Sequence, residues 1–409
     1  MTLSKTIHRP GIRLYSVLLA VLPVLATYAS GIPGFSMGDA ALAACCAWAV
    51  LGGFCCRIND FTVRPTAIVL AMYLLVLFNI ITALVQPEPE ITNILIRTIR
   101  YFFYLFAVAF CSRRMLDLEL CRRAVRVTAV LATGYLLTQY ILYTGAGVVL
   151  RGYVPFLKLY VEGYAATDYE GIYRIMYRPT SFFLEPAHYA RYAAVAAALF
   201  LFDGEKLKSR NVLAAGFVSL GVLLSTSAQG YVLLAVVWGA CLLTRWRAAE
   251  GPGVQGLFWG LGLGMPLLLW GILELPFVRE TLDRALNIDL SNLTNANTAL
   301  GARLGGFGAW AALPPVYQLI GMGFGVVPEE GWLSSAAYFL YGSGPLVLGL
   351  YLLYGAVCLK RTRGAARVVG LLFLLLLFSD DSFYNYLCVL FLSLACLEPV
   401  EAALGRDVP

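Results

Sequence analysis

The sequence predicts an all-α polytopic membrane protein with about 12 transmembrane helices, and three observations support this fold class. First, 60% of the 409 residues are hydrophobic and only 13% are charged, a balance not expected of a soluble globular protein. Second, apolar runs near the ~20 residues that cross a bilayer recur along the chain. Third, basic residues gather in alternate connections. We therefore expect one integral membrane domain over residues 1–409.

The expected spans follow from the apolar runs in chain order. They cover roughly residues 13–29, 39–56, 66–85, 91–112, 124–144, 187–203, 211–226, 229–244, 254–275, 334–357, 367–379 and 386–403. The first run lacks a convincing cleavage site, so we expect it to remain as a helix. The seventh, eighth and eleventh runs are short, and short or broken segments often line cavities because lipid does not tolerate loose backbone.

Basic residues also set the expected orientation, because cytoplasmic loops are enriched in Lys and Arg. Most of the 30 basic residues fall in connections such as 113–126, 206–210 and 360–367. Both termini are therefore expected in the cytoplasm. Two long loops, 145–178 and 276–333, are expected on the outer side, where their length suggests a function. The net charge of +6 is explained by topology and is not a signal for nucleic-acid binding.

The segment RPTSFFLEPAHYA (178–190) places ionisable residues where the first long loop meets an apolar run. Pro186 suits the first turn of a helix, and Glu185 before it faces the positive end of the helix dipole. His188 and Arg191 are three residues apart, so they share a helix face. Glu185 is the first candidate for a catalytic base and His188 the second. The alternative is that Glu185 only caps the helix and His188 is structural.

Arg97 and Arg100 lie inside the fourth expected span, in ITNILIRTIRYFFYLF, and share a face. A charge at mid-bilayer costs roughly 2.5–3.5 kcal/mol on insertion scales, so a functional role is the default expectation. Two guanidiniums suit a pyrophosphate, which arginine binds in bidentate fashion. The alternatives are an ion pair with Glu90 or another outer acid, or snorkelling to the interface.

Tyr169, Tyr173 and Tyr177 of the first long loop are candidates for stacking on sugar rings. Aromatic rings with hydroxyl edges suit carbohydrates, and they equally suit an interfacial aromatic belt. Charged residues among these tyrosines, such as Glu170 and Arg174, favour the carbohydrate surface.

The second long loop ends with GARLGGFGAW and LIGMGFG. Arg303 leads an amphipathic stretch. The glycines of GMGFG (321–325) allow a tight turn with exposed backbone N–H groups, although a bare flexible turn is the simpler interpretation. Asp380 and Asp381, between the last two expected spans, are interpreted as a solvated turn in preference to a second acidic pair.

Several chemistries find no support in the sequence. There is no Ser/His/Asp pattern, no metal-ligand spacing and no ATP-binding P-loop. The ten cysteines contain no C-x-x-C pair and are interpreted as small, reduced, buried residues. We therefore expect no metal and no cofactor, and no ATP-driven pump in a single chain.

Together the motifs resemble the Wzy-like repeat-unit polymerases and the related O-antigen ligases of bacterial surface polysaccharides. The resemblance covers the fourth to the eleventh span and rests on ILIRTIRYFFYLF, RPTSFFLEPAHYA, LLSTSAQG, the loop ending GARLGGFGAW…LIGMGFG, and YGSGPLVLGLYLLY. Two departures matter. Gln229 stands where the family often has arginine, and Ser334 and Ser335 stand in the region where the ligases carry a histidine. The second departure favours a polymerase over a ligase.

The resemblance implies the chemistry. Two polyprenyl-pyrophosphate-linked oligosaccharides would meet at the outer face of the bacterial cytoplasmic (inner) membrane. A sugar hydroxyl of the acceptor would attack the anomeric carbon of the donor, with inversion and loss of lipid pyrophosphate. The implied residues form two groups, Arg97, Arg100 and Arg191 for the pyrophosphate, and Glu185, Arg178, Arg303 and His188 for catalysis.

The expected partners are the lipid-linked oligosaccharides and membrane lipid, with a chain-length regulator and a flippase as further candidates. Two other functions stay open: ligase-type transfer, and a lipid-linked oligosaccharide flippase or other secondary transporter. A transporter would also use intramembrane arginines and broken helices. Against it, the expected spans show no twofold repeat.

Overall fold

The computed structural model describes residues 2–55, 64–86, 91–160, 177–202, 204, 206–245, 255–256, 259–260, 299–328, 333–380 and 386–396. In these ranges the regular secondary structure is helical and contains no strand, which confirms the all-α prediction there. Among the described residues, five helical stretches are long and apolar enough to cross a membrane: Ala67–Leu84, Ile94–Met115, Leu118–Ala146, Ala228–Arg245 and Ser335–Lys360. The count of about 12 spans and the sidedness of the loops stay predictions.

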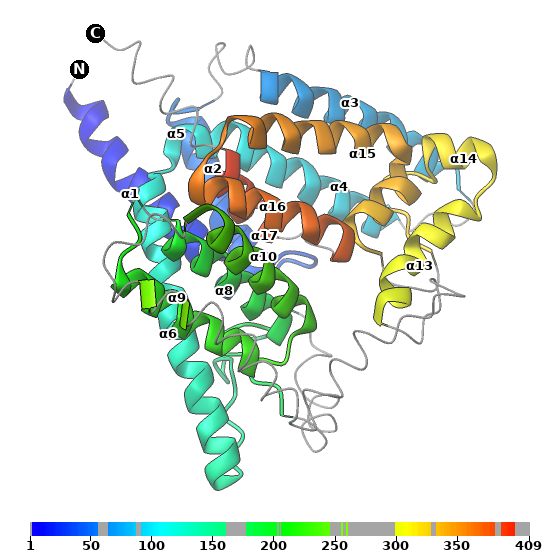
Figure 1. The fold of residues 1–409 in the computed structure, drawn as a ribbon. Helices are drawn as coiled ribbons and strands as arrows, with labels where there is room; N and C mark the ends of the chain where they lie inside the picture. The colour runs from blue at the N-terminus through cyan, green and yellow to red at the C-terminus, as the bar shows by residue number, and fades with distance from the viewer. Residues whose placement is uncertain are drawn as a thin grey trace. The chain divides into compact units, whose positions relative to one another are not determined.

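Most of the expected apolar runs lie in helices (Figure 1), and the ends mostly differ from the expected ones by a few residues, although the first helix begins at Thr2, 11 residues before the expected start. These helices are α1 (Thr2–Leu25), α2 (Met37–Leu51), α3 (Arg64–Leu84), α4 (Ile91–Phe106), α6 (Leu118–Ala146), α8 (Pro186–Leu201), α9 (Ser209–Leu224), α10 (Ala228–Arg245), α15 (Ser335–Arg361), α16 (Gly364–Ser379) and α17 (Tyr386–Cys396). The expected run 254–275 lies almost entirely outside the described residues.

The second long loop is not a loop throughout. It contains α13 (Ala299–Ala311) and α14 (Pro315–Ile320), where the sequence predicted a long loop with an amphipathic stretch from Arg303. The fourth span also differs from a plain α-helix, because α4 continues into a π-helix, η2 (Ala107–Ser112), and then into the short α5 (Arg113–Met115). π-helical turns inside helices are often found at functional sites.

The contacts between residues divide the helices into two units. Unit 1 comprises Met1–Tyr15, Leu42–Leu118 and Ala285–Pro409, and unit 2 comprises Ser16–Ala41 and Glu119–Arg284.

Unit 1 is built around α15, which packs against α3, α13, α14, α16 and α17. Gly344 breaks this helix with φ 73° and ψ 176°, and Pro345 follows it. The break brings the carbonyl oxygen of Leu319, in α14, into the space that a Cβ on Gly344 would fill. Deeper in the unit, the buried η2 is tied through Ser112, whose Oγ hydrogen-bonds the Tyr15 hydroxyl (2.8 Å) and the Ser393 hydroxyl (2.9 Å).

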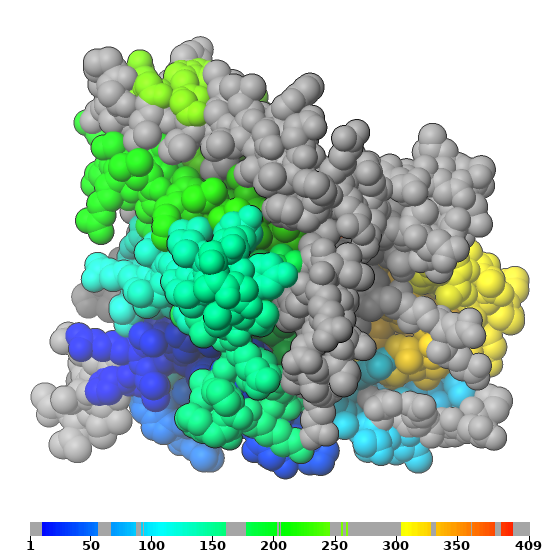
Figure 2. All heavy atoms as spheres, turned by 90° about the horizontal axis from the view of Figure 1, so that it is seen from below, coloured from blue at the N-terminus to red at the C-terminus, as the bar shows by residue number. Residues whose placement is uncertain are grey.

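Unit 2 is built around α8, which packs against α9 and α10 and is buried along most of its length. The alanine-rich sequence of α8 allows this close approach, as small residues do in membrane helix packing. A Cβ on Gly230 of α10 would lie 2.6 Å from the Ala190 Cβ, so only glycine fits. α6 is more exposed, with Leu131 61% and Ile141 64% accessible, and Figure 2 shows it (teal) at the surface.

Candidate functional site

The RPTSFFLEPAHYA segment of unit 2 is fixed along α6 before α8 begins. The Ser181 backbone N–H donates to Oε1 of Gln139 over 2.9 Å. The Phe182 ring stacks on Tyr135 with centroids 4.8 Å apart. The segment therefore reaches the start of α8 as ordered, partly buried backbone.

Two residues near this segment hold strained backbone. Ser181 has φ 56° and Thr226 has φ 54°, and no other non-glycine residue in the described ranges has a positive φ. Thr226 is the sharper outlier, because a β-branched residue is especially disfavoured in this region. Such strain tends to cluster at ligand-binding and catalytic sites.

Arg178 is anchored on this strained threonine. Its Nε donates to the Thr226 hydroxyl at 3.2 Å and its Nη2 donates to the Thr226 carbonyl oxygen at 3.4 Å. A guanidinium carries five N–H donors, so this anchoring leaves donors for a further acceptor. Arg178 is half-buried and can therefore meet an anion while its position stays fixed.

Arg191 attaches to the same junction between α9 and α10. Its Nε donates to Oε1 of Gln229 over 2.8 Å, and the Arg191 side chain is buried. Thr226 and Gln229 are three residues apart in the junction between α9 and α10. Arg178 and Arg191, two predicted site residues of this unit, therefore both hydrogen-bond to this junction. His188, in the first turn of α8, is half-buried.

Glu185 occupies the N-cap position of α8 with extended backbone (φ −135°, ψ 154°), and Pro186 takes the first helical position as predicted. The Glu185 side chain nevertheless makes no capping hydrogen bond. Within the described part of the chain, its half-buried carboxylate forms no hydrogen bond or ion pair. Glu185 therefore occupies the N-cap position, as the alternative interpretation expected. Its side chain, however, does not cap the helix.

The tyrosines of the first long loop fall into two groups. Tyr169 and Tyr173 lie outside the described residues. Tyr177 is buried, and its ring stacks on Tyr143 of α6 with centroids 4.0 Å apart and planes 13° from parallel. In this structure the Tyr177 ring is packed against protein and does not offer an open face.

In unit 1, Arg97 projects from α4 towards the glycine-rich turn. Its Nη1 donates to the Gly325 carbonyl oxygen at 3.3 Å, and its guanidinium carbon lies 5.9 Å from the centre of the Tyr338 ring. Both Arg97 and Arg100 are half-buried. The alternative partner Glu90 lies outside the described residues.

The glycine-rich turn itself corrects the sequence reading. The N–H groups of Gly321 and Gly323 donate to the carbonyl oxygens of Tyr317 (2.8 Å) and Gly342 (2.9 Å), so they are not exposed for a ligand. Gly325 has φ 98°, and a Cβ there would lie 2.6 Å from the Ile94 Cα. The glycines allow close packing, and the turn presents a carbonyl to Arg97.

Further positions singled out in the sequence lie in α13, at the start of α15 and at the end of α16. The backbone of Arg303 lies in α13, and its side chain is not among the parts that the structure describes. Asp380 is buried and its carbonyl accepts from the Ser335 N–H (2.8 Å) and hydroxyl (2.7 Å), so the solvated turn is wrong for this residue. Asp381 lies outside the described residues, and Ser334 caps α15.

Sequence reasoning missed Gln139, Thr226 and Tyr338. A buried glutamine in an apolar span was a usable signal for Gln139, because an amide at that depth needs hydrogen-bond partners. Nothing in the local sequence marks Tyr338 among the many tyrosines. In the described ranges no group of three or more His, Cys, Asp or Glu residues could hold a metal ion.

Compared with protein families and with curated proteins, the sequence matches no family model and no curated protein.

Proposed function

We propose that this chain is a Wzy-like polymerase, which joins polyprenyl-pyrophosphate-linked oligosaccharide repeat units at the outer face of a bacterial cytoplasmic membrane. One observation carries the proposal: the motifs of the resemblance pair through their polar groups. Arg178 bonds Thr226 of LLSTSAQG, 48 residues away. Arg97 bonds Gly325 of LIGMGFG, 228 residues away.

The Arg178–Thr226 pairing supports glycosyl transfer because it fixes a cation in the same segment as Glu185, whose side chain makes no capping hydrogen bond. The acceptor hydroxyl would lose its proton to Glu185 as its oxygen attacks the anomeric carbon of the donor. The bond from that carbon to the lipid pyrophosphate would break, and the pyrophosphate would leave with the electron pair. Arg178, which is half-buried and hydrogen-bonded to Thr226, would balance its charge, with Arg191 of the same unit as the second candidate cation. Such a displacement inverts the anomeric centre and depends mainly on positioning and charge stabilisation.

One observation favours the competing flippase. The break at Gly344 and Pro345 interrupts a stretch long enough to cross a membrane, and discontinuous helices are typical of transporter binding sites. The break does not explain the Glu185 carboxylate at the N-terminus of α8. We therefore keep the polymerase as the proposal and the flippase as the competing function.

The deciding experiment uses purified full-length protein in liposomes with lipid-linked repeat units, prepared from a strain that lacks this protein. We expect a ladder of longer lipid-linked oligosaccharides on a gel. Movement of the unit between leaflets without a ladder would replace the polymerase with a flippase. With lipid A-core added to the liposomes as an acceptor, transfer of the glycan to it without a ladder would replace the polymerase with a ligase.

A further inference from the structure

Two buried cysteines of unit 1 meet sulfur to sulfur just beyond the end of α2. Cys55 follows α2, and Cys111 lies in η2, 56 residues further along the chain. Their Sγ atoms are 3.8 Å apart, which is van der Waals contact, and both residues are in the thiol form. The polymerase mechanism uses neither of them, so the contact needs its own explanation.

A helix-ending motif sets the position of Cys55. The Gly53 N–H donates to the Val50 carbonyl oxygen over 2.9 Å. The Phe54 N–H donates to the Ala49 carbonyl oxygen, also over 2.9 Å, and together the two bonds make a Schellman motif. Gly53 has φ 67°, the left-handed conformation that this motif requires and that glycine adopts without strain. The chain therefore leaves α2 in a defined direction, and Cys55 is the next residue.

Cys111 is held in place from within η2. This π-helix is buried over its whole length. The next residue, Ser112, is tied through its Oγ to the hydroxyl groups of Tyr15 (2.8 Å) and Ser393 (2.9 Å). Both ends of the thiol pair are thus fixed by local structure, and π-helical turns are often found at functional sites.

The two sulfurs are close enough to be joined with little movement. A disulfide bond is about 2.05 Å long, so the Sγ atoms of Cys55 and Cys111 would have to approach by about 1.8 Å. A change of side-chain rotamer can supply such a movement. Because both thiols belong to one folded unit, the reaction between them is intramolecular and does not depend on a chance encounter.

The two thiols differ in access to solvent. Cys55 is 5% exposed and Cys111 is 0% exposed, so a small oxidant meets Cys55 first. In the sequence, Cys55 and Cys111 each come two residues before an arginine, Arg57 and Arg113, of connections expected in the cytoplasm. Thiols are kept reduced in that compartment, and the disulfides that do form there are usually transient or redox-sensing.

We propose that Cys55 and Cys111 form a reversible disulfide when the protein meets hydrogen peroxide. The Cys55 sulfur attacks one peroxide oxygen, the O–O bond breaks, and Cys55 becomes a sulfenic acid as a first water leaves. The Cys111 sulfur then attacks the Cys55 sulfur, the S–O bond breaks, and the hydroxyl leaves with the Cys111 proton as a second water. The two thiols lose two hydrogens, and the peroxide is reduced. A dithiol reductant reverses the reaction, and none of these steps depends on the polymerase function.

Counting the reactive thiols of the full-length protein tests the proposal. The protein is purified in detergent in its reduced form, treated with hydrogen peroxide, unfolded and alkylated with N-ethylmaleimide. Untreated protein should take up label on all ten cysteines, and treated protein on eight of the ten. Peptide mass spectrometry should find Cys55 joined to Cys111. Dithiothreitol should restore both labelling sites.

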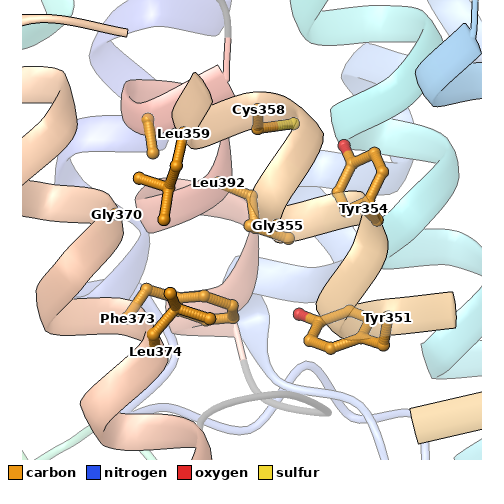
Figure 3. Close-up of a pocket in the computed structure, with 10 residues that line it drawn as sticks. Tyr351, Tyr354, Gly355, Cys358, Leu359, Gly370, Phe373, Leu374 and Leu392 are labelled. Carbon is orange, nitrogen blue, oxygen red and sulfur yellow. The ribbon is translucent and has the colours of Figure 1, made fainter. Parts of the chain in front are cut away.

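Three kinds of variant make the test specific. Cys55→Ala and Cys111→Ala should each lose the linkage, whereas Cys56→Ala, which removes the neighbouring thiol, should keep it. The matched control for a buried cysteine is Cys358→Ala, which should form the linkage as the parent does. Figure 3 shows Cys358 of α15 in a small pocket between α15, α16 and α17, whose other lining residues are aromatic, aliphatic or glycine.

Several outcomes would overturn the proposal. They are label on all ten cysteines after peroxide, a linkage between other cysteines, and a dimer band on a non-reducing gel in place of an internal linkage. A sulfinic acid at Cys55 with Cys111 still open to alkylation would show that Cys111 does not resolve the oxidised sulfur. If the alanine variants do not accumulate, the peptide map of the parent protein alone decides the question.

Discussion

Arg191 donates from its Nε to the Oε1 of Gln229 across 2.8 Å, which joins α8 to the first turn of α10. Arg191 is only 4% exposed, so water cannot readily replace this acceptor. The polymerases that the sequence resembles often have arginine at the position of Gln229. In this chain the side-chain amide of Gln229 instead accepts a hydrogen bond from Arg191.

Gln229→Ala should destabilise the protein by about 1–3 kcal/mol, because it leaves a buried charged donor without its acceptor. Gln229→Glu keeps an acceptor and should be closer to the parent, whereas Gln229→Arg places two guanidiniums together and should be the worst. Thermal unfolding in detergent measures the order. An arginine variant as stable as the parent would show that the Arg191 bond contributes little.

Glu185→Gln should abolish polymer formation while the protein still accumulates in the membrane and binds lipid-linked substrate. A general base contributes typically about 10²–10⁴-fold to rate, and glutamine cannot accept the proton. Because the Glu185 side chain makes no capping bond, the exchange should leave α8 intact. The measurement is the product ladder at matched protein levels, with Glu185→Asp expected to retain a trace of activity. A normal ladder from the glutamine variant would leave His188 or substrate-assisted deprotonation as the route.

Arg97→Ala should weaken donor binding roughly 10–150-fold, which corresponds to the 1.5–3 kcal/mol of a charged hydrogen-bond partner. Arg97→Lys keeps the charge but not the fork of donors, and should be intermediate. Arg123→Ala, at an exposed position on α6, is the control and should bind as the parent does. Binding of a lipid-linked unit by each purified variant gives the answer. Normal binding by Arg97→Ala would leave Arg97 as a packing residue of the glycine-rich turn.

Gly323→Ala should destabilise unit 1 strongly. Gly323 has φ 115°, a backbone conformation that costs other residues about 1–3 kcal/mol, and its Cβ would overlap the backbone of Ala83. Gly349→Ala is the matched control, because that glycine lies in α15 with nothing within 4 Å of the added atom. We expect the control to be neutral or slightly stabilising. Unfolding midpoints of the two variants in the same detergent test the difference.

Lys158→Cys should react with a membrane-impermeant thiol reagent in intact cells, whereas Lys208→Cys should react only after the membrane is opened. Both lysines are exposed, so accessibility to the reagent depends on the side of the membrane. The native cysteines are replaced first to remove background. Glu280→Cys extends the same test to the second long loop. Protection at both Lys158→Cys and Glu280→Cys would reverse the predicted orientation and remove the outer site.

The sequence predicted most of the described apolar helices because length and hydrophobicity are enough to mark such segments. It also placed Pro186 at the first helical position of α8, since a missing N–H is tolerated there. It did not predict the π-helix at Ala107–Ser112 or the helices α13 and α14, because none of these changes the hydrophobic pattern of its surroundings.

The site was predicted less completely, because its geometry depends on contacts between distant residues. Arg178 and Arg191 were recognised from the sequence, but their acceptors Thr226 and Gln229 are set by tertiary packing. The burial of Asp380 likewise follows from the Ser335 contact across α15 and α16, which no local pattern records.

The bond between Arg97 and Gly325 also sets an order of events during synthesis. The donor precedes the acceptor by 228 residues. At about 5–20 residues per second, Gly325 is made roughly 10–45 s after Arg97. During that interval the guanidinium of Arg97 cannot make this bond. Unit 1 can therefore reach its final arrangement around Arg97 only near the end of translation.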